Sequence, residues 1–315
     1  MKLLIIRPSA LGDTLMLMPA IAQLRGSTEI VLVGRSPGVD IISPYVNSVI
    51  DYEGSGWHPL FLEHLDVDHA FSLPKADCTV AFLSDPDGNV NRNLKAYLPK
   101  SSVHFFPAFP PEESSLHVAF YLAQCLKRAG LPVDPNKCLA EAGERPLLKD
   151  GGLAIQKNKI VFHTGSGGKG KNHPPDFWLQ IIGKLNSHFP LPSFSKSIIL
   201  LGPAEEQFLP FFTSRLDGAR SEILFAPELE QLQSILNQAP LYVGHDSGIT
   251  HLAAMLGTPT IALFKNSSMQ QWRPLGPVVR VIKNEEGREA LIRRTLKEAS
   301  VLIGKRSPSS TFPAK

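Results

Sequence analysis

The amino-acid sequence predicts an α/β fold of two domains, each a parallel β-sheet covered by helices. First, 315 residues are too many for one domain of ordinary size and suit two of about 150 residues. Second, short apolar runs alternate with amphipathic stretches, which is typical of parallel sheets. Third, a segment rich in Pro and Gly at residues 131–158 interrupts this alternation, which then starts again. We therefore expect domains at 1–150 and 151–304.

In the first half, strands are expected where apolar and β-branched residues cluster, namely at Leu3–Ile6, Glu29–Val33, Thr79–Leu83 and Ser102–Phe106. A helix is expected over Leu15–Leu24. Pro19 must lie either in its first turn or at a kink, because proline lacks the backbone N–H of a helix interior. The apolar spacing of Leu116–Ala129 predicts another helix, ended by Gly130 and then Pro132.

The second half repeats the alternation of strands and helices. Strands are expected at Lys159–His163, Ser197–Leu201, Glu222–Phe225, Leu241–Val243, Thr260–Phe264 and Val278–Lys283. Helices are expected at Asp176–Leu185, Glu205–Leu216, Glu228–Asn237, Ile249–Leu256 and Arg288–Ile303. The segment 305–315, with its Ser and Pro residues, is expected to be a flexible tail.

Composition and charge exclude several classes of protein. The formal net charge of +3 gives no indication of nucleic-acid binding. Residues 1–150 hold 13 Lys and Arg against 17 Asp and Glu, a net charge of −4, whereas residues 151–315 hold 19 against 12, a net charge of +7. A small anionic ligand is therefore expected on the second half. The cysteines Cys78, Cys125 and Cys138 lack the spacing of a zinc site or a disulfide scaffold.

The sequence also predicts a cytoplasmic protein. No apolar run reaches the roughly 18 residues that a membrane span needs. The apolar N-terminus is interrupted by Arg7 and Pro8 before it becomes long enough for a signal peptide.

A glycine-rich loop follows the first strand of the second half. Residues 165–172 read GSGGKGKN, which approaches the P-loop motif but ends in Asn172 instead of a hydroxyl residue that could bind magnesium. Two prolines follow and delay the next helix, which argues against an NTPase. Glycines still let backbone N–H groups approach an anion, and Lys169 and Lys171 add positive charge. We predict a phosphate or diphosphate site here, with a solvated surface loop as the alternative.

Two more polar clusters follow strands of the second half. Residues 244–251 (GHDSGITH) open a helix whose N-cap is Asp246 or Ser247, so backbone N–H groups would lie at the positive helix end. Residues 202–206 (GPAEE) place a carboxylate where it either accepts hydrogen bonds from a ribose or complements the helix dipole. Open α/β sheets bind ligands at the carboxyl ends of their strands, so we expect residues 244–251 to join the glycine-rich loop in one site. For residues 202–206 taken alone, the helix-dipole role is favoured.

A polar loop also follows the first strand of the first half. Residues 7–13 read RPSALGD, and Asp13 stands at the expected start of a helix. The Asp13 carboxylate either caps this helix or lies in a cleft between the domains, where it could take a proton from a hydroxyl group.

These motifs together resemble the ADP-heptose:lipopolysaccharide heptosyltransferases of glycosyltransferase family 9. The resemblance covers nearly the whole chain and rests on residues 6–13 with Pro19 downstream, Lys171-Asn172-His173-Pro174, residues 202–206, and residues 246–254. It implies a GT-B architecture, in which two Rossmann-like doubly wound domains face each other across a cleft. The domain at 1–150 would bind the acceptor and the domain at 151–304 the nucleotide-sugar donor.

The resemblance implies an inverting transfer of heptose, or a related sugar, from an ADP-sugar to a lipopolysaccharide-core-type glycolipid at the inner face of the membrane. It implies no cofactor, no metal and no nucleic-acid partner. Asp13 would be the general base, and Lys171 would help to hold the diphosphate and the sugar. The expected donor-binding residues are Ser166, Gly167, Lys169, Glu205, Glu206, Asp246, Ser247 and Gly248, with Glu206 preferred over Glu205 at the ribose. The expected acceptor-binding residues are Arg7, Ser9, Gly12 and Arg92.

Some features leave alternatives open. His173 stands where the family's K-x-W-P motif has Trp, a departure that bears on the donor sugar and nucleotide and not on the fold. The alternatives are a GT-B transferase with another nucleotide sugar or another acceptor, and a nucleotide-sugar-binding protein without turnover. The latter would have lost Asp13 or Lys171, and both are present. His251 is expected to be a structural residue of a helix. A basic set, Arg7, Arg35, Lys75, Arg92 and Lys95, could face a phosphorylated acceptor.

Overall fold

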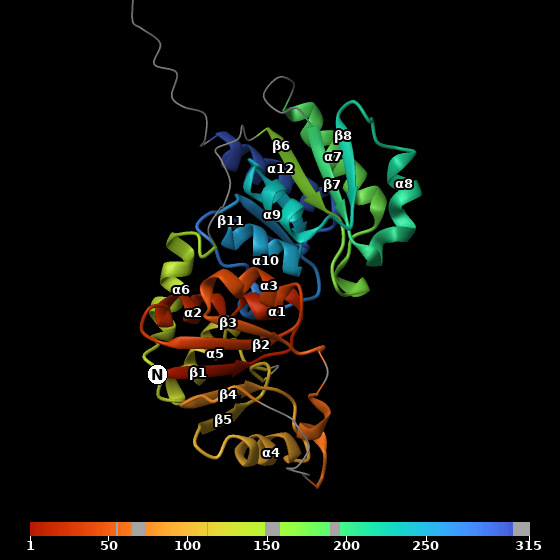
Figure 1. Ribbon diagram of the computed structural model, residues 1–315. Helices are drawn as coiled ribbons and strands as arrows, with labels where there is room; N and C mark the ends of the chain where they lie inside the picture. The colour runs from red at the N-terminus through yellow and green to blue at the C-terminus, as the bar shows by residue number, and fades with distance from the viewer. Residues whose placement is uncertain (55, 65–72, 112, 149–157, 190–195, 305–315) are drawn as a thin grey trace, which may run out of the picture. The chain divides into compact units, whose positions relative to one another are not determined.

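The computed structural model describes residues 1–54, 56–64, 73–111, 113–148, 158–189 and 196–304. The chain divides into two compact units, the N-terminal unit Met1–Glu141 and the C-terminal unit Ala142–Lys315. Each unit contains one parallel sheet with helices packed around it (Figure 1). The predicted α/β fold with two parallel sheets is thereby confirmed. The expected boundary after residue 150 and the expected tail at 305–315 lie outside the described residues.

The sheet of the N-terminal unit has the strand order β3-β2-β1-β4-β5. Its strands are β1 (Lys2–Ile6), β2 (Glu29–Gly34), β3 (Ser48–Asp51), β4 (Cys78–Phe82) and β5 (Ser102–Phe106). The chain proceeds outward from β1 to β3 and then returns to β4 on the other side of β1, so the topological switch point lies between β1 and β4. The four expected strands are present. The short edge strand β3 is not among them, because its residues are only partly buried and lack a strong apolar pattern.

The N-terminal unit and the stretch that follows it carry α1 (Leu11–Leu15), α2 (Met18–Leu24), α3 (Gly38–Ile42), η1 (Ser43–Tyr45), η2 (His58–Phe61), α4 (Asn89–Tyr97), α5 (Val118–Arg128) and α6 (Pro135–Glu144). The helix expected over Leu15–Leu24 is interrupted, and Pro19 lies in the first turn of α2, where its missing N–H breaks no bond. Helix α6 lies in the stretch that was expected to be irregular. The Asp134 carboxylate caps it by accepting hydrogen bonds from the N–H groups of Asn136 (2.9 Å) and Lys137 (3.2 Å).

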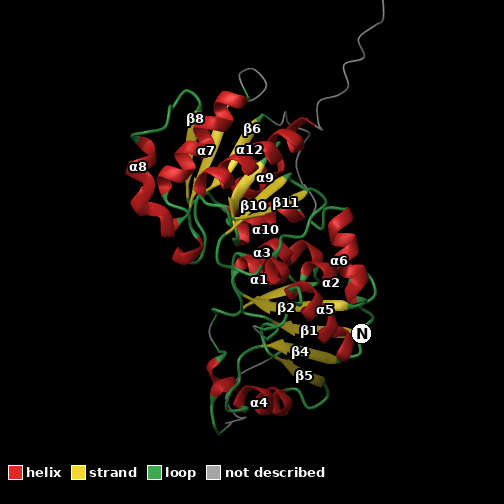
Figure 2. Ribbon diagram, turned by 180° about the vertical axis from the view of Figure 1, so that it is seen from behind, coloured by secondary structure: helices red, strands yellow, loops and turns green. Residues whose placement is uncertain are grey.

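The sheet of the C-terminal unit has the order β11-β10-β9-β6-β7-β8, which is the Rossmann order with its switch point between β6 and β9. Its strands are β6 (Lys159–His163), β7 (Lys196–Leu201), β8 (Ser221–Phe225), β9 (Tyr242–His245), β10 (Thr260–Phe264) and β11 (Val279–Lys283). Its helices are η3 (Lys169–Lys171), α7 (Pro175–His188), η4 (Pro203–Phe208), α8 (Leu209–Thr213), α9 (Leu229–Asn237), α10 (Gly248–Met255), α11 (Met269–Trp272) and α12 (Arg288–Gly304). Figure 2 shows the same elements from behind.

One expected helix of the C-terminal unit is wrong in detail. The stretch 205–216 forms the 3-10 helix η4 followed by the short helix α8, because Pro210 starts a new helix in its first turn. Helix α7 begins at Pro175, which agrees with the expected delay after the glycine-rich loop.

The central strands of both sheets are buried on both faces, as in most parallel sheets, whereas the edge strands β3, β5, β8 and β11 are largely half-buried. Ile5 and Ile6 of β1 and Phe162 of β6 are fully buried. In the C-terminal unit, Trp178 and Phe177 of α7 pack against β6 in the same core. These cores fix the ends of the strands. The polar loops begin at those strand ends and are therefore held at fixed positions.

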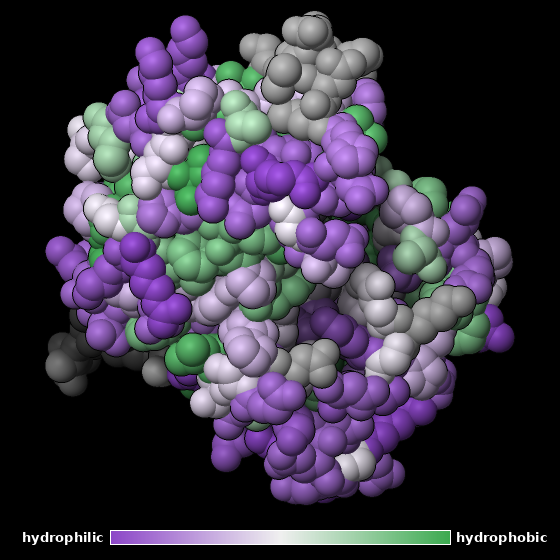
Figure 3. All heavy atoms as spheres, turned by 90° about the horizontal axis from the view of Figure 1, so that it is seen from below, coloured by the Kyte–Doolittle hydropathy of each residue, from purple (hydrophilic) through white to green (hydrophobic). Residues whose placement is uncertain are grey.

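In a space-filling view, hydrophobic side chains lie in patches among mostly hydrophilic ones (Figure 3). Within the described ranges, no helix combines the length and the apolar character needed to cross a lipid bilayer.

Candidate functional site

Four polar loops meet at the carboxyl edge of the C-terminal sheet. They follow β6, β7, β9 and β10, which are neighbouring parallel strands and therefore end at the same edge. The loops after β6 and β9 flank the topological switch point, where open α/β sheets bind their ligands. The tertiary structure thus brings together the glycine-rich loop, residues 202–206 and residues 244–251, as the sequence predicted.

The centre of this edge is an ion pair between Lys171 and Asp246. The Lys171 Nζ lies 2.8 Å from Asp246 Oδ2, and the Asp246 side chain is only 4% exposed. His251 Nε2, on α10, lies 3.7 Å from the other carboxylate oxygen. Burial would raise the pKa of Asp246, but its interactions with His251 and Lys171 outweigh burial and lower the pKa to about 2. Asp246 is therefore charged at neutral pH and balances the charge of Lys171.

Ser247 is the N-cap of α10. Its Oγ accepts a hydrogen bond from the Thr250 N–H at 3.4 Å and lies 3.3 Å from His163 Nδ1 at the end of β6. The next residue, Gly248, begins the helix. Between the two expected caps, Asp246 and Ser247, the structure selects Ser247 and leaves Asp246 to pair with Lys171.

The glycine-rich loop is closed by its own side chains. Ser166 Oγ lies 2.6 Å from Asn172 Oδ1 and accepts a hydrogen bond from the Gly168 N–H at 3.4 Å. Asn172, which replaces the hydroxyl residue of a P-loop, thus shapes the loop. Gly167 is exposed, and Lys169 begins η3, although its side chain lies outside the described part of the structure.

Glu205 and Glu206 have different surroundings. The Glu205 carboxylate is buried and accepts a hydrogen bond from the Gly202 N–H at 3.0 Å. Burial raises the pKa of Glu205, and the bond from Gly202 opposes this shift. The carboxyl group lies against Gly165, where a Cβ atom would come within 2.0 Å of it. Glu206 is exposed. Glu205 therefore braces two loops, whereas Glu206 is accessible to a ligand.

His173 packs as an uncharged aromatic ring. Its backbone N–H donates to His245 Nε2 at 2.8 Å, and its ring stacks on Phe177 with centroids 4.3 Å apart. His245 in turn meets the edge of Trp178 at 4.9 Å. Burial lowers the pKa of His173 to about 4 and that of His245 to about 3, so both are neutral at pH 7. His173 thus packs against Phe177 as an aromatic ring, at the position where the family motif has Trp.

A cavity of about 580 Å³ opens at this edge of the C-terminal sheet. The loops after β6, β7 and β10 contribute to its wall, among other residues through Thr164, Ser166, Gly167, Glu205 and Lys265. The cavity wall therefore carries hydroxyl groups and charges of both signs, next to an apolar part formed by Trp178, Phe208 and Phe212.

In the N-terminal unit, Arg7 supports the loop that carries Asp13. The Arg7 side chain is fully buried, with its guanidinium near the rings of Phe82 (5.6 Å) and Phe109 (5.3 Å). Its Nε donates to the backbone carbonyl of Asp13 at 3.1 Å, and its Nη1 to the carbonyl of Ala108 at 2.7 Å. Burial lowers the pKa of Arg7 to about 10, opposed by the nearby Asp13, so Arg7 remains charged. Because its side chain is buried, Arg7 stabilises the loop that carries Asp13 and is not exposed to an acceptor.

The other expected acceptor residues lie at or near the carboxyl edge of the N-terminal sheet. Asp13 stands in the first turn of α1, after Gly12, and both are partly exposed. Ser9 is also partly exposed, and its N–H donates to the Arg7 carbonyl at 2.9 Å. Arg92, on the exposed face of α4, donates to Asn89 Oδ1 at 2.8 Å.

The proposed basic set does not gather at one edge. Arg35 follows β2 and pairs with Glu53 at 3.4 Å. Lys75 precedes β4, close to Asp77, which accepts a hydrogen bond from the N–H of Lys2 at the start of β1. Lys75 therefore lies at the amino edge of the sheet, opposite to Arg7 and Arg35, because parallel strands start at one edge and end at the other.

The comparisons with known proteins follow this geometry. A family model described as glycosyltransferase family 9 (heptosyltransferase) matches residues 110–301, which is more than half of the chain. The chain belongs to this family. It is therefore a glycosyltransferase, as the sequence predicted. No curated protein sequence matches the chain.

Solved structures of the family share the fold. ADP-heptose lps heptosyltransferase II of E. coli has a TM-score of 0.68 at 18% identity, covering 97% of this chain and 99% of its own. A family 9 glycosyl transferase from Veillonella parvula has a TM-score of 0.69 at 14% identity, covering 96% and 97%. E. coli heptosyltransferase WaaC with ADP has a TM-score of 0.66 at 16% identity, covering 95% and 100%.

For this glycosyltransferase, the sequence prediction missed three polar residues at the carboxyl edge. His163 contacts Ser247, Lys265 Nζ donates to the Asn172 carbonyl at 3.3 Å, and Asn266 Nδ2 donates to the Gly170 carbonyl at 2.8 Å. Lys265 and Asn266 directly follow the expected strand at 260–264. The rule that identified the other loops could therefore have found them.

Within the described part of the chain, no group of three or more His, Cys, Asp or Glu side chains is arranged to hold a metal ion. A transfer that needs no metal remains a prediction.

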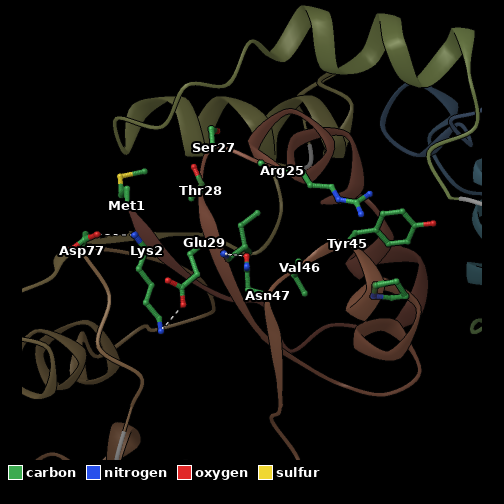
Figure 4. A pocket seen from close by; sticks show the side chains of 13 residues that line it. Met1, Lys2, Arg25, Ser27, Thr28, Glu29, Tyr45, Val46, Asn47 and Asp77 are labelled. Carbon is green, nitrogen blue, oxygen red and sulfur yellow. Dashed lines mark hydrogen bonds and ion pairs between the residues drawn. The ribbon is translucent and has the colours of Figure 1, made fainter.

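A second cavity, of about 680 Å³, lies at the amino edge of the N-terminal sheet (Figure 4). Lys2 Nζ pairs there with Glu29 at 2.9 Å, and Asn47 Oδ1 accepts a hydrogen bond from the Ile30 N–H at 2.8 Å. Arg25 lies over the ring of Tyr45. Lys2, Glu29 and Asn47 thus bind partners within the cavity wall, and the cavity lies opposite the edge that carries the family motif of this unit.

Replacing Gly165 by Ala is expected to displace the Glu205 carboxyl group, because the new Cβ would lie 2.0 Å from it. We expect the free energy of unfolding to fall by about 1 kcal/mol, because the displaced carboxyl group ends a flexible side chain and loses its bond from the Gly202 N–H. Gly167→Ala is the matched control, since none of the described atoms lies within 4 Å of a Cβ there. Urea unfolding measures both variants. Equal stability of the two would contradict the brace formed by Glu205.

Acid is expected to destabilise the C-terminal unit through His163. Burial lowers its pKa from 6.5 to about 4. The unfolded chain protonates His163 more readily than the folded protein does. The contribution of neutral His163 to the free energy of unfolding is therefore fully present above about pH 6.5 and decreases as the pH falls toward 4. We expect a loss of about 3 kcal/mol from His163 over this window. Urea unfolding across it should show a shallower pH dependence for His163→Gln, and an unchanged dependence would contradict this assignment.

Proposed function

We propose that this family 9 glycosyltransferase moves a heptose from ADP-heptose to a lipopolysaccharide-core-type acceptor, with inversion at the anomeric carbon and without a metal. The observation that carries the proposal is the carboxyl edge of the C-terminal sheet, where the Lys171–Asp246 pair and the capped start of α10 follow the same strand ends as the glycine-rich loop, which lines a cavity. Two proteins of the same fold support the donor: one is described as an ADP-heptose lps heptosyltransferase and the other was solved with ADP.

The donor would bind to the C-terminal unit. The glycine-rich loop, with Ser166, Gly167 and Lys169, and the start of α10 at Ser247 and Gly248 would face the diphosphate. Lys171 has three N–H donors and gives one to Asp246, so the others can reach the donor. Exposed Glu206 would accept hydrogen bonds from the ribose, while Glu205 holds the loop from below.

The acceptor would bind to the N-terminal unit. Asp13 would take the proton from the attacking hydroxyl group as general base. Ser9, Gly12 and Arg92 are accessible to an acceptor, whereas Arg7 contributes through the loop that it supports. A glycolipid acceptor requires that the enzyme act at the inner face of the membrane, as a cytoplasmic protein at its periphery.

Calorimetric titration with ADP, ADP-heptose, UDP, GDP, ATP and NAD, first without metal and then with magnesium, tests the donor. We expect ADP and ADP-heptose to bind most tightly, with no gain from magnesium. Preference for UDP or GDP would leave the glycosyltransferase assignment unchanged but mean that the donor is another nucleotide sugar. His173→Trp would then be the first variant to make. A requirement for magnesium would contradict the metal-independent transfer.

A further inference from the structure

The Lys171–Asp246 pair leaves the negative charge of a donor diphosphate largely unbalanced. Lys171 is the cation that the family motif supplies, but its Nζ is 2.8 Å from a carboxylate that is 4% exposed. The carboxylate is ionised at neutral pH, so the pair as a whole is neutral. A nucleoside diphosphate carries several negative charges, which increase as it leaves the sugar. The site therefore needs positive charge beyond Lys171, and Lys169 of the glycine-rich loop is one expected source.

Lys265 meets this need by its position. It directly follows β10, which lies next to β9, and so stands at the same edge as Asp246. Its Nζ lies 3.3 Å from the Asn172 carbonyl of the glycine-rich loop, and its side chain is exposed. It adjoins the 580 Å³ cavity together with Ser166 and Gly167. Among the residues that the structure describes, no carboxylate lies within ion-pair distance of Nζ.

The hydrogen bond from Lys265 to the Asn172 carbonyl does not explain why residue 265 is charged. A backbone carbonyl can be bound by a neutral donor, and the neighbouring Asn266 binds the Gly170 carbonyl in this way at 2.8 Å. The longer 3.3 Å contact of Lys265 uses one of the three N–H donors of its ammonium group. Two further donors remain on this exposed side chain, which lines the cavity.

We propose that Lys265 binds the diphosphate of the nucleotide donor and stabilises it as the leaving group. This assignment rests on the proposed glycosyl transfer. In that reaction the bond between the anomeric carbon and the diphosphate oxygen breaks, and its electron pair stays on the diphosphate. The acceptor oxygen forms the new bond to the anomeric carbon, and its proton passes to Asp13. Lys265 changes no covalent bond and acts on the diphosphate charge alone.

The test compares Lys265→Met, which removes the charge, with Lys265→Arg, which retains it. Lys184→Met, on the exposed face of α7, is the matched control. Titration calorimetry measures the Kd of each protein for ADP, UDP, GDP and adenosine at low and high salt. For the preferred nucleoside diphosphate, we expect Lys265→Met to raise the Kd about tenfold and to weaken its salt dependence, with adenosine binding unchanged. Lys265→Arg should stay within about threefold of the wild type.

The outcomes separate this assignment from the proposed function. Equal diphosphate affinity of Lys265→Met and Lys184→Met would overturn the assignment even if ADP-heptose is the donor. A wild type that prefers UDP or GDP, with that affinity lost in Lys265→Met, would support the assignment and overturn ADP-heptose as donor. A wild type that binds no nucleoside diphosphate would overturn both. An equal loss of adenosine affinity in Lys265→Met would show that Lys265 only shapes the loop.

Discussion

Replacement of Asp13 by Ala or Asn is expected to lower kcat by about 10²–10⁴-fold, the usual contribution of a general base. The Kd for ADP should stay within about twofold, because Asp13 belongs to the N-terminal unit and the donor residues to the C-terminal unit. Arg7 holds the Asp13 carbonyl from the buried side, so the loop should keep its conformation in both variants. Single-turnover kinetics with ADP-heptose and calorimetry with ADP measure the two effects.

Asp40→Asn is the matched control for Asp13. Asp40 is also an acidic residue in the first turn of a short helix, α3, which packs against α1. It should show near-normal turnover, since loss of a helix-dipole interaction costs only about 0.3–1 kcal/mol of stability. Near-normal turnover of Asp13→Asn as well would mean that another group accepts the proton.

Lys171→Ala is expected to raise the Kd for ADP about tenfold or more and to lower kcat by about 10²-fold. Removal of Lys171 also leaves the Asp246 carboxylate buried beside His251 without its cation. The free energy of unfolding should therefore fall by about 1–2 kcal/mol, less than for a fully buried pair, because the Lys171 side chain is 41% exposed and water screens the charge. Adding Asp246→Asn to Lys171→Ala should restore much of this stability without restoring turnover.

A double-mutant cycle over Lys171 and Asp246 measures this coupling through urea unfolding and the Kd for ADP. We expect the losses of the single variants to be strongly non-additive, because the two side chains act as one pair. Additive losses of stability would contradict the ion pair. Unchanged ADP affinity in Lys171→Ala would show that this lysine does not contact the diphosphate.

Most elements of the fold could be predicted from the sequence, because the signals are local. The apolar run of residues 3–6, the N-capped start of α10 and the two prolines at the start of α7 act within a few residues of themselves. The prediction failed where local signals were weak or misread. The edge strand β3 has little apolar pattern. The Asp134-Pro135 start of α6 lies within a stretch whose other prolines and glycines are typical of a linker.

The sequence by itself determined the fold class, the order of elements, the family motifs and the edge at which they lie, since a parallel strand carries the loop after it to its carboxyl end. Only the tertiary structure decided which side chains meet there. It pairs Lys171 with Asp246, 75 residues later, buries Arg7 and Glu205, leaves Glu206 exposed, and brings Lys265 to the glycine-rich loop. The physical reason is that charge, burial and hydrogen bonding depend on distances across neighbouring strands, which strand order sets and local sequence patterns do not contain.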